Sequence, residues 1–190
     1  MEQVFLSMGS NLGDRLANLR QAVASLRNFS GVTALSDAYE TEPVGLAEQP
    51  WFLNAVVALE LDYDALELNY DESVPDPLHD EAAPHLLLES LLSIERTLGR
   101  ERDSANFIPK GPRVLDLDIL LYGSRVIDSP KLTIPHPAMH LRRFVLEPLA
   151  QIAPGVEHPV LRRSALQLLQ ALPPNGPLVR KLASLQSPEE

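Results

Sequence analysis

Two carboxylates, Asp116 and Asp118, stand two residues apart in a stretch that is otherwise apolar from Val114 to Tyr122. Gly111-Pro112 and Gly123 bound this stretch, a pattern typical of a single β-strand. Because side chains alternate between the two faces of a strand, both carboxylates project from one face, roughly 6.5 Å apart at Cα. Leu115, Leu117, Ile119 and Leu121 are expected on the opposite face.

Two neighbouring acids on one face of an apolar strand would repel each other and resist burial. A divalent cation between them removes both problems, and Mg²⁺ is normally held by one or two carboxylates together with the phosphates of a substrate. The pattern therefore indicates a magnesium site. The alternative is an edge strand whose outer face is solvated, since exposed acids are common.

The distribution of cations along the chain supports an anionic ligand. The net charge is −10 at pH 7, which argues against non-specific binding to nucleic acid. No Lys or Arg occurs from Asn28 to Glu95, but nine of the 16 basic residues fall between Arg96 and Arg143: Arg96, Arg100, Arg102, Lys110, Arg113, Arg125, Lys131, Arg142 and Arg143. They bracket the acidic strand on both sides. This arrangement suits a small polyanion bound with a metal, such as a nucleoside triphosphate.

Composition bounds the class of protein. The chain has 190 residues, of which 45% are hydrophobic, which is typical of one globular domain with a core. It contains no cysteine, so disulfides and thiolate metal sites are excluded. We find neither a signal peptide nor an apolar run long enough to cross a membrane, and we expect a cytoplasmic protein.

Familiar nucleotide-binding signatures are missing from the chain. It has neither a G-x-x-x-x-G-K-[ST] loop nor a G-x-G-x-x-G turn. Gly9 to Gly13 could approach phosphates through backbone N–H groups, although an ordinary turn is the simpler reading. His136 follows a short strand close to the cations, where a neutral imidazole could donate to a phosphate without adding charge.

An aromatic ring and an amide share one face of a second strand. Phe52 and Asn54 lie two residues apart in the apolar segment from Trp51 to Leu61. A buried amide needs hydrogen-bond partners, which are either backbone groups or the polar edge of a flat heterocycle. Phe52 beside it suits stacking on such a ring, with an ordinary core strand as the alternative.

The order of predicted elements indicates an α+β fold. We expect strands over 3–8, 32–41, 51–61, 114–122 and 132–134, and helices over 15–27, 84–98, 143–152, 164–172 and 177–185. The first helix is predicted to be capped by Asp14, and the second to begin at Pro84. The order β-α-β-β-α-β is that of a ferredoxin-like core, a mainly antiparallel sheet with helices packed on it, here followed by a C-terminal helical extension. We expect one domain over residues 1–186, with 62–83 as an acidic loop insertion and 187–190 as a flexible tail.

Five sequence blocks, taken in order, resemble those of the 6-hydroxymethyl-7,8-dihydropterin pyrophosphokinases of folate biosynthesis. The blocks are Gly9 to Asp14, Tyr39 to Pro43, Gln49 to Ala55, Gly111 to Ile119, and Pro135-His136. The resemblance covers nearly the whole chain except Asp62 to Ala83 and the extreme C-terminus. It implies transfer of the β,γ-pyrophosphoryl group of ATP to the hydroxymethyl oxygen of the pterin, with release of AMP. It also implies a ferredoxin-like fold and a monomer.

The resemblance further implies a set of site residues. Two Mg²⁺ ions are expected on Asp116 and Asp118, which form the catalytic set together with Arg100 and Arg113. The positions that match ATP contacts are Glu95, Arg100, Arg102, Arg113, Ile119, Lys131, Thr133, His136 and Arg142. The positions that match the pterin pocket are Thr41, Val44, Phe52, Asn54 and Phe144, with Phe52 and Phe144 as the two stacking rings. The polar segment from Arg100 to Lys110 is expected to act as a lid.

Two other classes of protein remain compatible with these residues. One is another two-metal enzyme on a ferredoxin-like sheet, such as a nucleotidyltransferase or a cyclase, which would release pyrophosphate instead of AMP. The other is a non-catalytic nucleotide-binding module, which would bind ATP without turnover.

Overall fold

The computed structural model describes residues 2–46, 48–62, 77–100 and 111–185. Its helices are α1 (Arg15–Leu26), α2 (Pro77–Thr97), α3 (Arg143–Ile152) and α4 (Ala165–Ala171), with a 3₁₀ turn at Met139–Leu141. Its strands are β1 (Gln3–Ser10), β2 (Ser30–Leu35), β3 (Ala38–Thr41), β4 (Phe52–Leu61), β5 (Asp116–Tyr122), β6 (Ile127–Asp128), β7 (Thr133–Ile134), β8 (Glu157–His158), β9 (Arg163–Ser164) and β10 (Val179–Ala183).

Six strands form one antiparallel sheet in the order β10-β3-β4-β1-β5, with β2 pairing beside β3 along β4. The strand β1 lies between β4 and β5, so the predicted aromatic-amide strand and the acidic strand are both its direct neighbours. The expected combination of helices with a mainly antiparallel sheet is confirmed. None of the helices in the described part of the chain is long and apolar enough to cross a bilayer.

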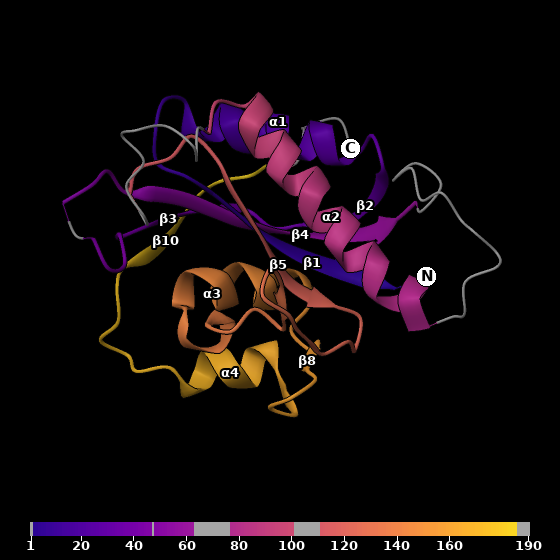
Figure 1. Ribbon diagram of the computed structural model, residues 1–190. Helices are drawn as coiled ribbons and strands as arrows, with labels where there is room; N and C mark the ends of the chain where they lie inside the picture. The colour runs from indigo at the N-terminus through magenta and orange to yellow at the C-terminus, as the bar shows by residue number, and fades with distance from the viewer. Residues whose placement is uncertain (1, 47, 63–76, 101–110, 186–190) are drawn as a thin grey trace.

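The sheet separates two hydrophobic cores (Figure 1). The helices α1 and α2 cover one face, where Leu19, Leu26, Leu87 and Leu91 are buried. The helices α3 and α4 lie on the other face, where side chains such as Leu146 pack on the sheet. Because successive side chains of a strand point to opposite faces of the sheet, the same strands contribute apolar side chains to both cores.

The first half of the chain largely follows its predicted elements. Asp14 caps α1, because its carboxylate accepts a hydrogen bond from the N–H of Ala17 at 3.0 Å. The strand β1 continues to Ser10, so Gly9 lies within the sheet and not in a loop. The segment expected as one strand over 32–41 forms two strands, β2 and β3, which both pair with β4.

Two predictions about the middle of the chain are wrong. The helix α2 begins at Pro77, not at Pro84, so residues 77–83 of the expected insertion are helical, while 63–76 lie outside the described residues. Pro84 lies inside α2 although it lacks the backbone N–H of that turn. Leu121 was expected on the face of Ile119, but the register of β5 on β1 shifts so that Leu120 is an extra residue and Leu121 joins the core under α3.

The expected helix over 177–185 is also wrong, since residues 179–183 form the strand β10 along the edge of β3. Without β10 the outer edge of β3 would carry unpaired N–H and C=O groups, which a helix could not satisfy. Arg180 and Lys181 form ion pairs with Glu40 and Asp37 of the strand region that β10 covers. The predicted helical extension is therefore limited to α3 and α4, and the tail at 187–190 lies outside the described residues.

Candidate active site

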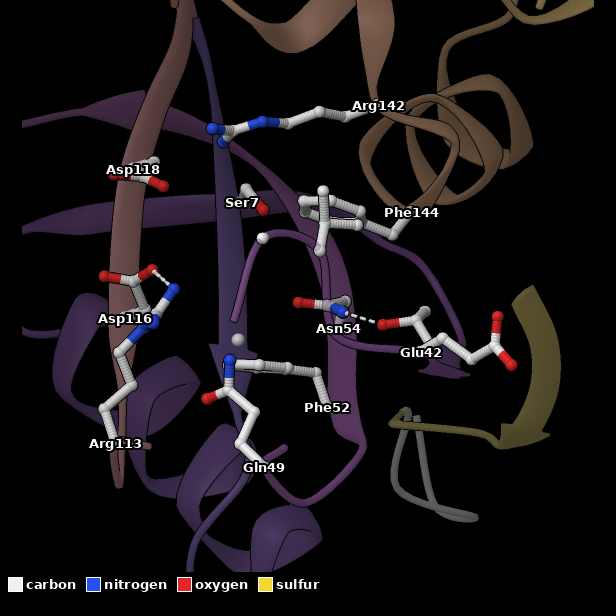
Figure 2. A pocket seen from close by; sticks show the side chains of 14 residues that line it. Ser7, Glu42, Gln49, Phe52, Asn54, Arg113, Asp116, Asp118, Arg142 and Phe144 are labelled. Atoms are coloured by element: carbon white, nitrogen blue, oxygen red, sulfur yellow. Dashed lines mark hydrogen bonds and ion pairs between the residues drawn. The ribbon is translucent and has the colours of Figure 1, made fainter. Parts of the chain in front are cut away.

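A pocket opens on the α3 face of the sheet, at the point where the apolar core on that face ends. On β1 the residues of this face change from Phe5 to Ser7 and Gly9, and on β5 they change from Leu120 to Asp118 and Asp116. On β4 the same face continues from Val56 to Asn54 and Phe52, which line the pocket together with residues from α3. The pocket encloses about 790 Å³, part of it open to solvent (Figure 2).

One half of the pocket is neutral and holds all five residues predicted for the pterin: Thr41, Val44, Phe52, Asn54 and Phe144. The amide of Asn54 is buried, and its Nδ2 donates a hydrogen bond to Oγ1 of Thr41 at 2.6 Å. Phe52 and Phe144 come from opposite sides of the pocket, with Asn54 between them at the back (Figure 2). This arrangement can hold a flat ring between two aromatic faces and read its edge through the amide.

Close packing between two strands fixes the position of Asn54. Gly9 of β1 is its cross-strand partner, and a Cβ placed on Gly9 would lie 2.7 Å from Oδ1 of Asn54. Any larger residue at position 9 would require the amide of Asn54 to move. Glycine at this position therefore allows β1 and the Asn54 side chain to approach closely.

The other half of the pocket is charged, and Asp116 is its most tightly held carboxylate. Oδ2 of Asp116 accepts a hydrogen bond from Nη2 of Arg113 at 2.6 Å, and Oδ1 contacts the guanidinium of Arg100. Burial would raise the pKa of Asp116, but the charges and hydrogen bonds of Arg113 and Arg100 outweigh burial and hold this pKa below its usual value. Asp116 is therefore ionised at neutral pH.

Asp118 shares the pocket with Asp116 but has a different electrostatic environment. It accepts no hydrogen bond from any other described residue, and burial followed by the charge of Asp116 raises the pKa of Asp118 to about 6. Arg142 offsets part of this rise from across the pocket. A cation bound between the two carboxylates would stabilise the charged form of Asp118.

Arg142 and His136 complete the charged half. Nη1 of Arg142 lies 3.5 Å from Nε2 of His136, and its guanidinium carbon lies 5.7 Å from the ring centre of Phe144. Nδ1 of His136 accepts a hydrogen bond from the N–H of Ala138 at 3.1 Å, which places the proton of the neutral ring on Nε2. Burial, followed by the Arg142 charge, lowers the pKa of His136 to about 4. The ring is thus uncharged at neutral pH and lies beside Arg142.

Three of the residues expected to contact ATP lie away from the pocket. Ile119 is buried in the core beneath α1 and α2, and Lys131 and Thr133 are exposed at the β6–β7 hairpin. Glu95 is buried behind the site, where Oε1 accepts hydrogen bonds from Arg100 at 2.7 Å and from the N–H of Leu117 at 2.8 Å. In this structure Glu95 positions Arg100 and the strand β5. Arg102 and the lid residues 101–110 lie outside the described residues.

The pocket is also lined by four residues that the sequence did not identify, Ser7, Glu42, Gly45 and Gln49, and by Gly9, which was expected in a loop and lies in β1. Ser7 and Gly9 pair across strands with Asp118 and Asp116. Their signal in the sequence was the appearance of a serine and a glycine in an apolar strand. Gln49 has a structural contact, because its Oε1 accepts a hydrogen bond from Asn11 at 3.0 Å.

Asp116 and Asp118 are the carboxylates of the charged half, whereas Glu42, which also lines the pocket, accepts a hydrogen bond from the N–H of Leu178. Among the described residues, no group of three or more His, Asp or Glu side chains could enclose an ion. Two carboxylate groups provide only oxygen donors, which is the donor type that Mg²⁺ prefers, and Mg²⁺ usually takes its remaining ligands from water and phosphates. The donor set therefore fits Mg²⁺ bound together with an anionic substrate.

Comparison with known proteins agrees with this geometry. The family model of 7,8-dihydro-6-hydroxymethylpterin-pyrophosphokinase (HPPK) matches residues 5–72 and 77–154. The chain belongs to the HPPK family. ATP-dependent pyrophosphoryl transfer in folate biosynthesis is the reaction of this family.

Individual relatives of this HPPK chain include single enzymes and much longer proteins. It is 40% identical over 155 residues to the 2-amino-4-hydroxy-6-hydroxymethyldihydropteridine pyrophosphokinase of Bacillus subtilis, covering 80% of this chain and 79% of that protein. It is 36% identical over 174 residues to the folic acid synthesis protein fol1 of Schizosaccharomyces pombe, covering 90% of this chain but only 21% of fol1.

A solved structure shows the same fold. The wild-type HPPK-DHPS of Plasmodium falciparum, crystallised with pterin and p-hydroxybenzoate, superimposes with a TM-score of 0.60 at 16% identity. The match covers 89% of this chain and 41% of the Plasmodium chain. Both long relatives thus extend well beyond the region that corresponds to this chain.

Proposed function

We propose that this chain transfers the pyrophosphoryl group of ATP to the hydroxymethyl oxygen of 6-hydroxymethyl-7,8-dihydropterin and releases AMP. The observation that carries the proposal is the division of one pocket into an aromatic-amide half and a carboxylate-arginine half. A flat heterocycle in the first half would present its substituent to the second half, where phosphates would bind. Family membership supports the same reaction.

The neutral half would orient the acceptor. Phe52 and Phe144 would stack on the pterin, and the amide of Asn54, held by Thr41, would hydrogen-bond to its polar edge. Val44, which is about half exposed, would close the outer side of the ring. These contacts would align the hydroxymethyl oxygen with the phosphate, which is the main requirement for phosphoryl transfer.

The charged half would hold the donor. Asp116 and Asp118 would hold Mg²⁺, with two ions proposed, and this metal would supply charge neutralisation on the phosphates and a lower pKa for the attacking hydroxyl. Arg100, Arg113 and Arg142 would stabilise charge on the transferred group and on AMP, and Arg102 would assist them. The Nε2 proton of His136 would be donated to a phosphate oxygen.

The same proposal covers the remaining predicted ATP contacts and the architecture. Glu95 would act indirectly by positioning Arg100, and Lys131 and Thr133 of the β6–β7 hairpin would contact a nucleotide that extends beyond the pocket. The side chain of Ile119 is buried in the core beneath α1 and α2, so it has no role in the proposed site. The strand order β5-β1-β4-β3, with α1 and α2 as the crossover helices, supports a ferredoxin-like core within a single domain. We also propose that the protein acts as a monomer, as the resemblance implies.

The decisive experiment is to identify the products. The protein should form AMP when it is incubated with ATP, Mg²⁺ and the reduced pterin, and no AMP when the pterin is omitted. Formation of pyrophosphate would indicate a nucleotidyltransferase or cyclase instead. Binding of ATP with no product of either kind would indicate a nucleotide-binding module.

A further inference from the structure

We propose that the strand β10 positions the pterin-binding half of the pocket, and that Arg180 is the positioning residue through which it acts. This inference rests on the proposed binding of pterin between Phe52 and Phe144. It concerns the segment between β3 and β4, from Glu42 to Trp51, of which all but residue 47 is described. That segment supplies Glu42, Val44, Gly45 and Gln49 to the lining of the pocket.

The first end of this segment is attached to the start of β10. The N–H of Glu42 donates a hydrogen bond to the carbonyl of Leu178 at 3.1 Å, and the N–H of Leu178 donates one to Oε2 of Glu42 at 3.0 Å. The next pair, Val179 and Thr41, continues the ladder into the sheet. Glu42 and Thr41 both line the pocket, so the chain at the start of β10 is hydrogen-bonded to one lining residue and lies directly beside a second.

The second end of the segment is attached to the same strand through Arg180. The guanidinium carbon of Arg180 lies 5.8 Å from the ring centre of Trp51, and its Nε donates a hydrogen bond to Oε2 of Glu40 at 2.9 Å. Trp51 immediately precedes Phe52, one of the two stacking rings. Arg180 thus contacts the residue next to the aromatic wall of the pocket.

Glu40 connects these contacts to the helical layer. Its side chain is largely buried, and Oε1 accepts a hydrogen bond from Arg15 of α1 at 2.8 Å. Nη1 of the same arginine donates to the carbonyl of Trp51 at 2.8 Å. Arg15, Glu40, Arg180 and Trp51 therefore form one cluster that holds the junction between the segment and β4.

Arg180 could position the pocket, or it could only stabilise the folded C-terminal strand. A second residue of β10, Lys181, allows these two roles to be distinguished. Lys181 is the neighbour of Arg180 on β10, its side chain is similarly exposed, and it forms an ion pair with Asp37. Asp37 lies at the far end of β3, where it also accepts a hydrogen bond from Gln151. Lys181 thus ties β10 to the sheet, and its ion pair is with Asp37 and not with the described part of the segment from 42 to 51.

A fixed segment reduces the ordering cost that pterin binding would otherwise carry. Because ion pairs and cation–π contacts at exposed sites are individually weak, we expect Arg180→Ala to raise the KM for pterin roughly threefold to tenfold. The KM for ATP should stay within about a factor of two, since the arginines and carboxylates that would bind ATP lie on other elements. Arg180→Lys, which keeps the charge, should recover part of the loss.

The experiment compares wild type with Arg180→Ala, Arg180→Lys and Lys181→Ala in steady-state AMP formation, with pterin and ATP varied separately. Trp51 is the only tryptophan of the chain, so quenching of its fluorescence by acrylamide reports this junction without any substrate. We expect faster quenching in Arg180→Ala and wild-type quenching in Lys181→Ala.

Equal effects of the two alanine variants on both KM values would overturn the proposal, because they would show a purely structural role. An unchanged KM for pterin in Arg180→Ala would overturn it too. If wild type itself forms no AMP, the proposed function fails, and quenching of Trp51 then decides whether Arg180 holds the segment.

Discussion

The two halves of the pocket are held in place by different forces. The neutral half is fixed by strand pairing and close packing, since Asn54 fits against Gly9 and donates to Thr41. The charged half is fixed by ion pairs, because Arg100 and Arg113 both bind Asp116. The ion pairs use the same groups that phosphates and metal would use. The neutral half is therefore preformed, whereas under the proposed function the charged half would exchange internal partners for the ligand.

The largest effect should come from the two carboxylates. Replacing either Asp116 or Asp118 with Ala should slow AMP formation by about a thousandfold, which corresponds to a loss of about 4 kcal/mol of transition-state stabilisation. Binding of pterin, measured by calorimetry without ATP, should change little. If either variant forms AMP near the wild-type rate at saturating Mg²⁺, that aspartate is not required for catalysis.

The stability of the same two variants should differ, and this difference tests the comparison directly. Asp116→Ala leaves Arg113 without its carboxylate and Arg100 with Glu95 alone, so it should lower the free energy of unfolding by about 3 kcal/mol. Asp118→Ala removes a carboxyl that accepts no hydrogen bond from the described residues and whose pKa is raised, so it should be neutral or stabilising. Chemical denaturation in EDTA measures both values, and equal losses would contradict the distinction.

In the neutral half, Asn54→Leu should weaken pterin binding roughly a hundredfold, because it removes the amide and leaves polar groups unpaired. The affinity for an ATP analogue should remain close to wild type. Equilibrium titration with each ligand separately provides the measurement. Parallel losses for both ligands would indicate a folding defect instead of a binding role.

A smaller loss of pterin affinity is expected from Gly9→Ala, because this substitution removes no group that would form a hydrogen bond with the pterin. The new methyl group would displace Oδ1 of Asn54. It should reduce pterin affinity about tenfold, which corresponds to the weakening of one hydrogen bond. Gly31→Ala in β2 is a suitable control, since its nearest contact is a backbone oxygen at 3.9 Å. If both glycine variants bind pterin alike, packing between β1 and β4 does not set the position of Asn54.

The smallest effect concerns acid stability. Hydrogen bonds from Arg180 and then Arg15 lower the pKa of Glu40 below its usual value of 4.5. The stabilisation is therefore fully present above pH 4.5 and is lost as the pH falls through the lower pKa of the folded state. Since Arg180 is mostly exposed, the contribution should be only about 1 kcal/mol. Thermal unfolding of wild type and Glu40→Gln should differ at pH 7, and the difference should shrink as the pH falls below 4.5.

The side chains that line the pocket were predicted from the sequence more completely than the strands and helices that support them. The period-two pattern of Asp116 and Asp118, and of Phe52 and Asn54, is local, so each pair could be assigned to one face of one strand. The resemblance to a known family then added residues such as Phe144, which local patterns could not connect to β4. These five pterin-pocket residues do line one cavity.

The errors arose where long-range pairing decides the structure. The segment 177–185 has apolar residues at spacings that fit a helix, yet the open edge of β3 selects a strand there. The extra residue at Leu120 depends on the register between β1 and β5, which no local pattern encodes. The role of Glu95 behind Arg100 and the contribution of Ser7 likewise follow from contacts between strands and helices distant in sequence.

The helix α3 belongs to the core and to the pocket at once. Val145, Leu146 and Leu149 are buried against the sheet, while Phe144 and the preceding Arg142 line the pocket. A change in the volume of a buried residue such as Leu149 would shift the helix as a body and carry Phe144 with it. Laboratory evolution toward larger or smaller heterocyclic substrates should therefore select some substitutions in the core beneath α3 that make no contact with the substrate. Resistance to an inhibitor bound in the pocket should be able to arise through the same core positions.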